Sequence, residues 1–384
     1  MARRLALLLL IGASCFPRGW NRADPTIPET MGFPFTAGPY LVRMDQHQTA
    51  VALRAPLAEA PTLEWWAVTS TTAPPERKNK VTFDSRSGGL WAAVMSDVPH
   101  DVQIAYEVHS SAGDAGPLTF RQGVSRGTAF RFAAFGDTRS GHQVHRLLVD
   151  AIAKEDVDFV INSGDLVEFG GYDDQWMTFF RIEAPLASHA FLYPVVGNHD
   201  DSPQRLFERY FLTELYARGT RYYVQDFGDV RFVAMDSEVE ISRDSTQWNF
   251  IESNLKEGAE KDMIMVLSLH RPPYSSGTHG SELGFRALVD ELAIKYGVEL
   301  VLAGHDHDYE RTKPIRGTTH IVAASAGANI RPVGPSDFTE VLRTEPHFVI
   351  LDVDGKSLTG RTINLAGETF DTFVIEPNPP GGRP

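Results

Sequence analysis

Five short apolar segments of this chain run directly into polar clusters, and this repeated pattern constrains the fold more than any other feature of the sequence. Short apolar runs predict β-strands, and their near-continuous hydrophobicity indicates burial on both faces beneath covering helices. The predicted strands are Phe130–Phe135, Phe159–Asn162, Phe191–Val196, Met263–Leu269 and Leu300–Ala303. Helix-length amphipathic stretches lie between strands, at His142–Lys154, Ser245–Lys256 and Ser281–Tyr296. This alternation is typical of the α/β class.

The polar clusters lie where the predicted strands end, which is the edge at which open α/β sheets bind their ligands. They are Gly136-Asp137-Thr138-Arg139, Gly164-Asp165-Leu166, Gly197-Asn198-His199-Asp200, His270-Arg271-Pro272-Pro273 and Gly304-His305-Asp306-His307. In four of the five a glycine precedes the polar residue, which permits a sharp exit and a close backbone approach. One such cluster would be read as a turn or a helix cap, but five in series indicate a shared site.

The last cluster is the most specific, because His305 and His307 are spaced i, i+2. In an extended segment, side chains with this spacing lie on the same face, so both imidazoles can converge on one point. Such convergence suits metal binding. The only cysteine, Cys15, lies near the N-terminus, so we expect any metal to be held by His, Asp, Asn or Glu.

Residues 33–128 have a different pattern, with short β-branched and aromatic segments separated by turn clusters. The segments are Thr49–Leu53, Leu63–Val68, Leu90–Val94 and Gln103–Val108. Their even spacing predicts an all-β sandwich of roughly seven strands that precedes the α/β domain.

The N-terminus, residues 1–20, has the pattern of an export signal. Arg3 and Arg4 precede an apolar run, Leu5–Ala13, that is too short to span a bilayer. The alternatives are a buried first helix, or a lipoprotein signal ending at Cys15. Export without disulfides favours a bacterial periplasm, cell surface or secreted location.

The net charge of −14 opposes general binding to nucleic acids, whose phosphate backbones it repels. No later segment is apolar enough to predict a membrane span. The Pro- and Gly-rich residues 377–384 are predicted to form a flexible tail that follows a catalytic domain over residues 129–376. The oligomeric state is not predicted by the sequence.

The order of the five clusters resembles the calcineurin-like metallophosphoesterase superfamily, over about Phe130 to Asp352. Two segments are similar to motifs of its purple-acid-phosphatase branch, His270-Arg271-Pro272-Pro273-Tyr274-Ser275-Ser276 and Gly304-His305-Asp306-His307-Asp308-Tyr309-Glu310-Arg311. The resemblance implies a two-sheet αββα sandwich, preceded by a fibronectin-III-like β-domain.

The resemblance also implies two metal ions, with ligands carried over position by position. One metal would take Asp137, Asp165 and His307, and the other Asp165, Asn198, His270 and His305, so that Asp165 bridges the pair. Mixed N and O ligation suits ions of the Fe, Zn or Mn class. Two such ions clamp a phosphoryl group and generate hydroxide near neutral pH.

The residues after Asn198 are expected to complete the catalytic group. By the same resemblance, His199 is the general acid that protonates the leaving alkoxide. Asp200 can orient that imidazole or raise its pKa, or it can instead be the N-cap of a following helix.

The sequence departs from the family at the first metal site. Arg139 stands where many members have histidine, and Glu168 stands where purple enzymes have an iron-binding tyrosine. We therefore expect two divalent metals and no colour. Arg139 either holds a phosphate oxygen in a bidentate contact or pairs with an acid such as Glu168, and Glu168 can also serve as an extra metal ligand. Tyr274 and His279 are candidates for the substrate entrance.

These features predict an exported phosphatase that hydrolyses small phosphate monoesters with metal-bound hydroxide. Two alternatives stay open. One is a phosphodiesterase or nucleotidase, and the other is a surface binding protein with a weak metal site.

Overall fold

The computed structural model describes residues 27–28, 31–69 and 78–381. The predicted export signal, including Cys15, lies outside these residues. Within them, no helix is both long and apolar enough to cross a membrane.

The N-terminal part of the described chain is a β-sandwich made of two four-stranded sheets, ordered β1-β2-β6-β5 and β4-β3-β7-β8. The strands are β1 (Ala37–Arg43), β2 (Thr49–Arg54), β3 (Thr62–Ala67), β4 (Asn79–Thr82), β5 (Asp84–Ser85), β6 (Leu90–Met95), β7 (Gln103–His109) and β8 (Ala115–Arg121). The four segments predicted from sequence correspond to β2, β3, β6 and β7. The described sandwich has one strand more than expected, and β5, with two residues, is too short to leave a periodic signal.

The second part contains two large sheets that pack face to face. A six-stranded sheet has the order β11-β10-β9-β19-β20-β21, and a seven-stranded sheet has the order β12-β13-β14-β15-β17-β16-β18. The strands are β9 (Phe130–Phe135), β10 (Phe159–Asn162), β11 (Phe191–Pro194), β12 (Tyr223–Phe227), β13 (Val230–Ala234), β14 (Ile264–Ser268), β15 (Leu300–Ala303), β16 (Tyr309–Thr312), β17 (Thr319–Ala323), β18 (Thr339–Arg343), β19 (His347–Asp354), β20 (Ser357–Asn364) and β21 (Thr369–Ile375). All five strands predicted for this region are present, and β9, β10 and β11 run parallel.

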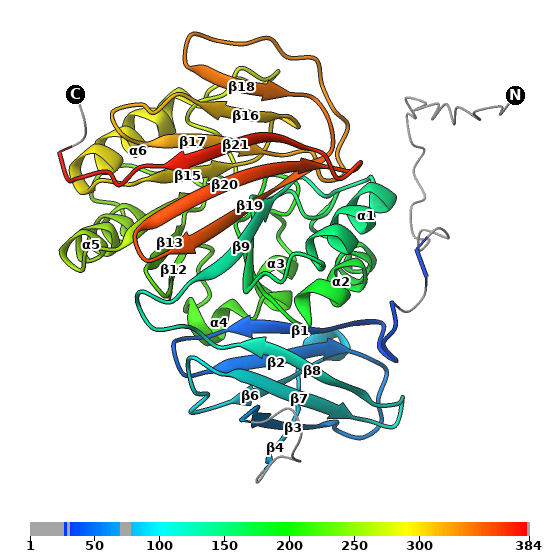
Figure 1. Ribbon diagram of the computed structural model, residues 1–384. Coiled ribbons are helices and arrows are strands. Elements are labelled where there is room, and N and C mark those ends of the chain that lie inside the picture. Colours follow the sequence, from blue (N-terminus) through cyan, green and yellow to red (C-terminus); the bar gives the residue numbers. More distant parts are fainter. Residues whose placement is uncertain (1–26, 29–30, 70–77, 382–384) are drawn as a thin grey trace, which may run out of the picture.

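Helices cover the outer face of each sheet, which confirms the predicted αββα arrangement (Figure 1). The helices are α1 (His142–Ile152), α2 (Asp173–Ala187), α3 (Leu206–Tyr210), α4 (Thr213–Tyr216), α5 (Thr246–Glu260) and α6 (Leu283–Tyr296). Alternate residues of β9 enter different cores. Phe132 lies in the core between the sheets, while Ala133 and Phe135 lie in the core beneath α1 and α2. This burial on both faces explains the continuous hydrophobicity of the strand.

Helix α2 was not among the helices predicted from the sequence, and it is buried on most sides. Ten of its fifteen residues are buried, since it packs both on α1 and on strand β1 of the β-sandwich. Phe180 of α2 stacks on Tyr40 of β1 with ring centroids 4.1 Å apart. The Tyr40 hydroxyl donates to the Tyr210 carbonyl at 2.6 Å. These contacts fasten the sandwich to the α/β part.

Part of the predicted flexible tail is packed against the α/β region. Asn378 is only 4% exposed and donates through its side chain to the Val298 carbonyl at 2.9 Å. Its backbone N–H donates to Glu299 at 3.4 Å.

Candidate metal centre

The polar clusters that follow the strands converge at one edge of the two packed sheets. Ligand atoms of Asp137, Asp165 and His307 all lie within 4.8 Å of one another, and all three residues are buried. Asp137 follows β9, Asp165 follows β10 and His307 follows β15, so the group joins both sheets. The structure therefore brings together the three residues expected to hold the first metal.

A second group shares Asp165 with the first. The Nε2 atom of His270 lies 3.4 Å from Asp165 Oδ1 and 3.2 Å from His305 Nδ1. Both histidine rings therefore meet beside one carboxylate oxygen. The side-chain oxygen Oδ1 of Asn198 is buried and has no hydrogen-bond partner among the described residues.

The backbone of the centre is held in an uncommon conformation. Asp137, Asp165, His305 and His307 all have positive φ, between 54° and 78°. For residues other than glycine this left-handed region is strained, and such residues cluster at functional sites. The preceding glycines were expected to permit both a sharp exit and a close backbone approach. Of the four, only Gly164 has positive φ, whereas the close approach is present, as at Gly197, where an added Cβ would lie 2.3 Å from Asp165 Oδ1.

The chemistry of these groups fits metal ions. Asp137 Oδ1 is buried and accepts no hydrogen bond from the described residues, although an unpaired buried carboxylate oxygen is costly. His270 Nδ1 contacts the Ser163 carbonyl at 2.8 Å, and His307 Nδ1 contacts the Asn329 carbonyl at 2.7 Å. A carbonyl accepts only from N–H, so each ring leaves the lone pair of Nε2 available to a metal.

The histidine pKa values follow from burial and from neighbouring charges. Burial, helped by the charge of His270, lowers the pKa of His305 to about 2, so its ring is neutral, as a ligand must be. Burial also lowers the pKa of His270, but the carboxylates of Asp165 and Asp137 outweigh it and raise that pKa overall. A cation at this point is therefore stabilised by the carboxylates, whether it is a proton or a metal ion.

His199 lies at the rim of the centre. Its Nδ1 atom contacts the Glu168 carbonyl at 2.8 Å, so Nδ1 carries a proton and the ring orientation is set. Its Nε2 atom faces Asp165 Oδ2 at 3.9 Å, and about a quarter of the side chain is exposed. The ring is thus placed between solvent and the ligand cluster.

Asp200 does not contact the His199 ring. Its Oδ1 accepts from the N–H groups of Leu166 at 2.9 Å and Val167 at 3.1 Å, and its Oδ2 accepts from Gly197 N–H at 2.9 Å. Nor is it a helix cap, since the next helix, α3, begins at Leu206. Asp200 instead ties the segment after Asp165 to the segment before Asn198.

Arg139 and Glu168, the two departures from the family pattern, pair with each other. Arg139 Nη1 donates to Glu168 Oε2 at 2.7 Å, and Arg139 Nε donates to Asp165 Oδ2 at 3.1 Å. Arg139 Nη2 lies 3.4 Å from His307 Nε2. Burial lowers the Arg139 pKa, but Asp165 and Glu168 outweigh it and raise that pKa, so the guanidinium is a fixed charge beside the first ligand group.

The two candidates for the substrate entrance lie in different places. The His279 ring stacks on His305 with centroids 4.2 Å apart and contacts Arg331, so it borders the centre. The Tyr274 hydroxyl donates to Asp290 at 2.7 Å, and its ring packs beneath Arg286. Tyr274 thus contacts helix α6, and its ring also meets the rings of His320 and Phe338.

Sequence reasoning did not find the residues that fasten the loop carrying His279. Asp306 accepts from the N–H of His279 at 2.7 Å and from the hydroxyl of Ser275, and Glu310 accepts from the N–H of Ser276 at 2.6 Å. Asp306 and Glu310 were visible within the last motif, but a motif does not reveal which loop its acidic residues will contact.

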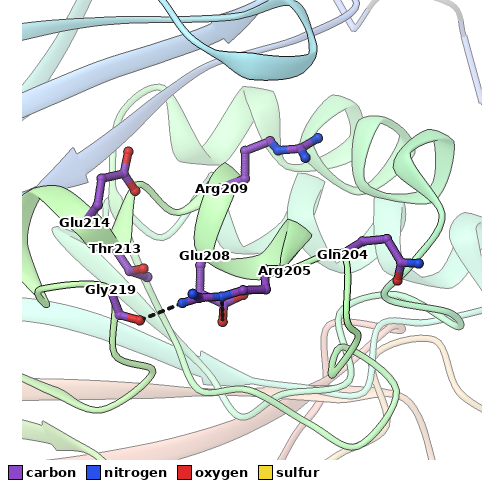
Figure 2. A pocket seen from close by; sticks show the side chains of 7 residues that line it. All are labelled: Gln204, Arg205, Glu208, Arg209, Thr213, Glu214 and Gly219. Atoms are coloured by element: carbon purple, nitrogen blue, oxygen red, sulfur yellow. Dashed lines mark hydrogen bonds and ion pairs between the residues drawn. The ribbon is translucent and has the colours of Figure 1, made fainter.

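Two hollows lie near this rim. One, of about 360 Å³, is lined by Asn198 and His199 and by residues 168–172. The other, of about 330 Å³, lies around α3 and α4 and contains none of the predicted ligands (Figure 2). There Arg205 donates to the Gly219 carbonyl at 2.9 Å. Gln204 lines both hollows.

Comparison with known proteins agrees with this geometry. Residues 130–309 match the family described as calcineurin-like phosphoesterase, a range that begins with β9 and ends just after His307. The chain contains a calcineurin-like phosphoesterase domain. The candidate ligands from Asp137 to His307 all lie within that domain.

Curated relatives of the phosphoesterase domain are purple acid phosphatases, some of them named inactive. "Probable inactive purple acid phosphatase 24" of Arabidopsis thaliana is 30% identical over 281 residues, which cover 59% of this chain and 44% of that protein. Purple acid phosphatase 21 of the same plant is 28% identical over 198 residues, covering 48% of this chain and 45% of that protein. The chain thus spans less than half the length of these relatives.

Solved structures extend the similarity of fold to the β-sandwich. The purple acid phosphatase PPD1 from yellow lupin has a TM-score of 0.76 at 20% identity, covering 88% of this chain and 74% of that one. A structure of PhoD has a TM-score of 0.66 at 11% identity, covering 93% of this chain and 95% of that one. The protein therefore has the fold of a purple-acid-phosphatase-like phosphoesterase.

Proposed function

We propose that this protein is an exported, metal-dependent phosphatase that hydrolyses small phosphate monoesters. The observation that carries the proposal is the convergence of Asp137, Asp165 and His307, where the buried Oδ1 of Asp137 accepts no hydrogen bond from the described residues and lies 3.4 Å from His307 Nε2. The relatives named purple acid phosphatases support the choice of monoesters. The pattern of residues 1–20 supports export.

Two divalent ions are proposed at this centre. Asp137, Asp165 and His307 would hold one, and Asp165, Asn198, His270 and His305 would hold the other. Ions held there would supply positive charge to the phosphoryl oxygens and activate water. Glu168 is engaged by Arg139 and Ser140, which argues against its use as a further ligand. We therefore expect purified, metal-loaded protein to lack a visible charge-transfer band, and such a band would contradict the assignment.

The protein's own side chains would position the ester and move a proton. His199, oriented by the Glu168 carbonyl, is proposed to donate the proton on Nε2 to the leaving oxygen. Asp200 acts as a positioning residue for the two segments that carry Asp165 and His199. Arg139, already bonded to Asp165, is close enough to the centre to hold a phosphoryl oxygen as well.

Elemental analysis combined with a phosphate-release screen tests this proposal. We expect close to two metals per chain and faster turnover of p-nitrophenyl phosphate than of bis-p-nitrophenyl phosphate. The reverse preference would favour a phosphodiesterase. Less than one metal per chain, with no turnover of any ester, would favour a binding protein with a weak metal site.

A further inference from the structure

The hollow of about 360 Å³ beside His199 has a composition unlike the rest of the centre. Its wall includes the aromatic residues Phe169 and Tyr172, the small polar residue Ser202 and the amide of Gln204. The volume is in the range of pockets that hold small organic ligands, roughly 300–1,000 Å³. It therefore has room for more than a phosphate group.

The two aromatic side chains at this hollow are unusually exposed. Phe169 is 54% exposed and Tyr172 is 50% exposed, and they are the only aromatic residues among the exposed large hydrophobic side chains of the described chain. Their rings meet edge to face with centroids 5.6 Å apart. Paired apolar surface left in water next to a site of chemistry indicates a binding surface.

The segment that carries these rings is firmly attached to the His199 loop. Gly170 N–H donates to the His199 carbonyl at 2.7 Å, and the Trp176 indole donates to the Gly170 carbonyl at 2.9 Å. A Cβ at Gly170 would lie only 2.0 Å from the Asp200 carbonyl oxygen. The rings are therefore held at a fixed place relative to the imidazole, as preorganised binding requires.

The charged groups that line the hollow disfavour a phosphate group there, in addition to the one proposed to bind at the metal centre. Its lining residues include the carboxylates of Glu168 and Asp201 but no lysine or arginine. The Ser202 hydroxyl is buried and has no partner among the described residues, so it is available to a ligand heteroatom. A neutral group with a planar ring and polar atoms fits this wall.

We propose that this hollow binds the leaving group of the substrate, and that this group carries an aromatic or heteroaromatic ring that packs on Phe169 and Tyr172. This inference rests on the proposed function, because His199 can protonate only a leaving oxygen on its own side of the centre. The substrate class is then a monophosphate ester of a ring-bearing alcohol, such as a nucleoside or a phenylalkyl alcohol.

Matched pairs of esters test the inference without changing the leaving alkoxide. Adenosine 5′-phosphate is compared with ribose 5-phosphate, and 3-phenylpropyl phosphate with propyl phosphate. Stacking of one ring on an aromatic side chain corresponds to a gain of about tenfold or more in kcat/KM. We expect that preference in the wild type for at least one pair, and its loss in Phe169→Ala/Tyr172→Ala, while kcat/KM for the ring-free esters stays unchanged. A preference found only in the adenosine pair identifies the ring as a nucleobase, and one found only in the phenylpropyl pair identifies it as a phenyl group. Val374→Ala, at an exposed residue of β21, is the control for loss of surface hydrophobicity.

Binding of the ring-bearing alcohol alone separates this inference from the proposed function. Adenosine and 3-phenylpropanol are titrated into the metal-loaded wild type and the double variant by calorimetry. Binding by the wild type but not by the variant supports the hollow as a ring site, even if no ester is turned over. Equal kcat/KM within both ester pairs, or an equal loss for ring-bearing and ring-free esters in the variant, would overturn it. Failure of both adenosine and 3-phenylpropanol to bind the wild type would overturn it as well.

Discussion

Replacing Asp200 tests whether the candidate centre depends on a carboxylate that contacts neither substrate nor ligand side chains. The carboxylate is 1% exposed and accepts three backbone N–H bonds, from Leu166, Val167 and Gly197. Asp200→Ala would leave all three donors without that acceptor. Asp200→Asn would keep an oxygen for two of them but turn its amide group toward the third, so two donors would face each other.

The expected loss follows from the strength of these bonds. Burial and the neighbouring Asp165 carboxylate raise the pKa of Asp200 to about 8, so near pH 7 its carboxyl group is mostly neutral and each of these hydrogen bonds contributes about 0.5–1.5 kcal/mol. Each buried donor left unpaired adds a cost of about 1–3 kcal/mol. Because some relaxation will occur and the bonds are not additive, we expect the free energy of unfolding to fall by about 4 kcal/mol in Asp200→Ala and by about 2 kcal/mol in Asp200→Asn. Urea unfolding of the metal-free protein, followed by tryptophan fluorescence, measures both.

The neighbouring Asp201 provides the matched control. It is about half exposed and forms a surface ion pair with Arg221, so Asp201→Asn should change the unfolding free energy by less than about 1 kcal/mol. Since Asp200 holds the segments of Asp165 and Asn198, its loss should also weaken metal binding by roughly 10–100-fold in equilibrium dialysis. An Asp200→Ala variant with wild-type stability and metal affinity would refute the reasoning.

Three further substitutions probe other parts of the molecule. Asp165→Asn should abolish turnover and lower metal content, because one carboxylate serves both ligand groups; substantial residual activity would contradict the bridging role. Arg139→Ala should raise KM in a steady-state assay if the guanidinium holds a phosphoryl oxygen, and unchanged kcat and KM with metals retained would exclude that contact. Burial raises the pKa of Glu299 to about 7, whereas the unfolded value is near 4.5, so unfolding releases a proton between these pH values. Glu299 should therefore contribute a fall of about 3 kcal/mol in the free energy of unfolding from pH 4.5 to pH 7. Glu299→Gln should reduce the wild-type difference between urea titrations at pH 5 and pH 8 by about that amount, while Asp200 and Asp308, whose pKa values burial raises to about 8, keep their own contributions.

Much of the fold could be predicted because its signals are local. The nearly continuous apolar runs of β9, β10 and β15 were identified with their correct bounds, since strands buried on both faces have few polar residues to interrupt them. Helix α2 was not predicted, although its polar and apolar residues are about as well separated around the helix as those of α5, which was.

The predicted ligands of the centre share one local property, a position directly after a strand. Parallel strands end at the same edge of a sheet, which predicts that the clusters after β9 and β10 lie together. The grouping of Asp137 and Asp165 with His307, which follows a strand of the other sheet, was implied by the family resemblance. The left-handed backbone at these residues carries no signal of its own in the sequence, because only packing of the surrounding strands can hold it.

Only the tertiary structure decided which partner each polar side chain contacts. The sequence alone determined that Asp200 and Tyr274 lie near predicted site residues along the chain. In the fold, Asp200 accepts from three backbone amides and the Tyr274 hydroxyl donates to Asp290. The sequence also left two choices for Arg139, which the fold places against Glu168 and Asp165, 29 and 26 residues away along the chain. Neighbours in sequence are set by covalent bonds, whereas these contacts depend on how two sheets and their loops pack, which no local pattern encodes.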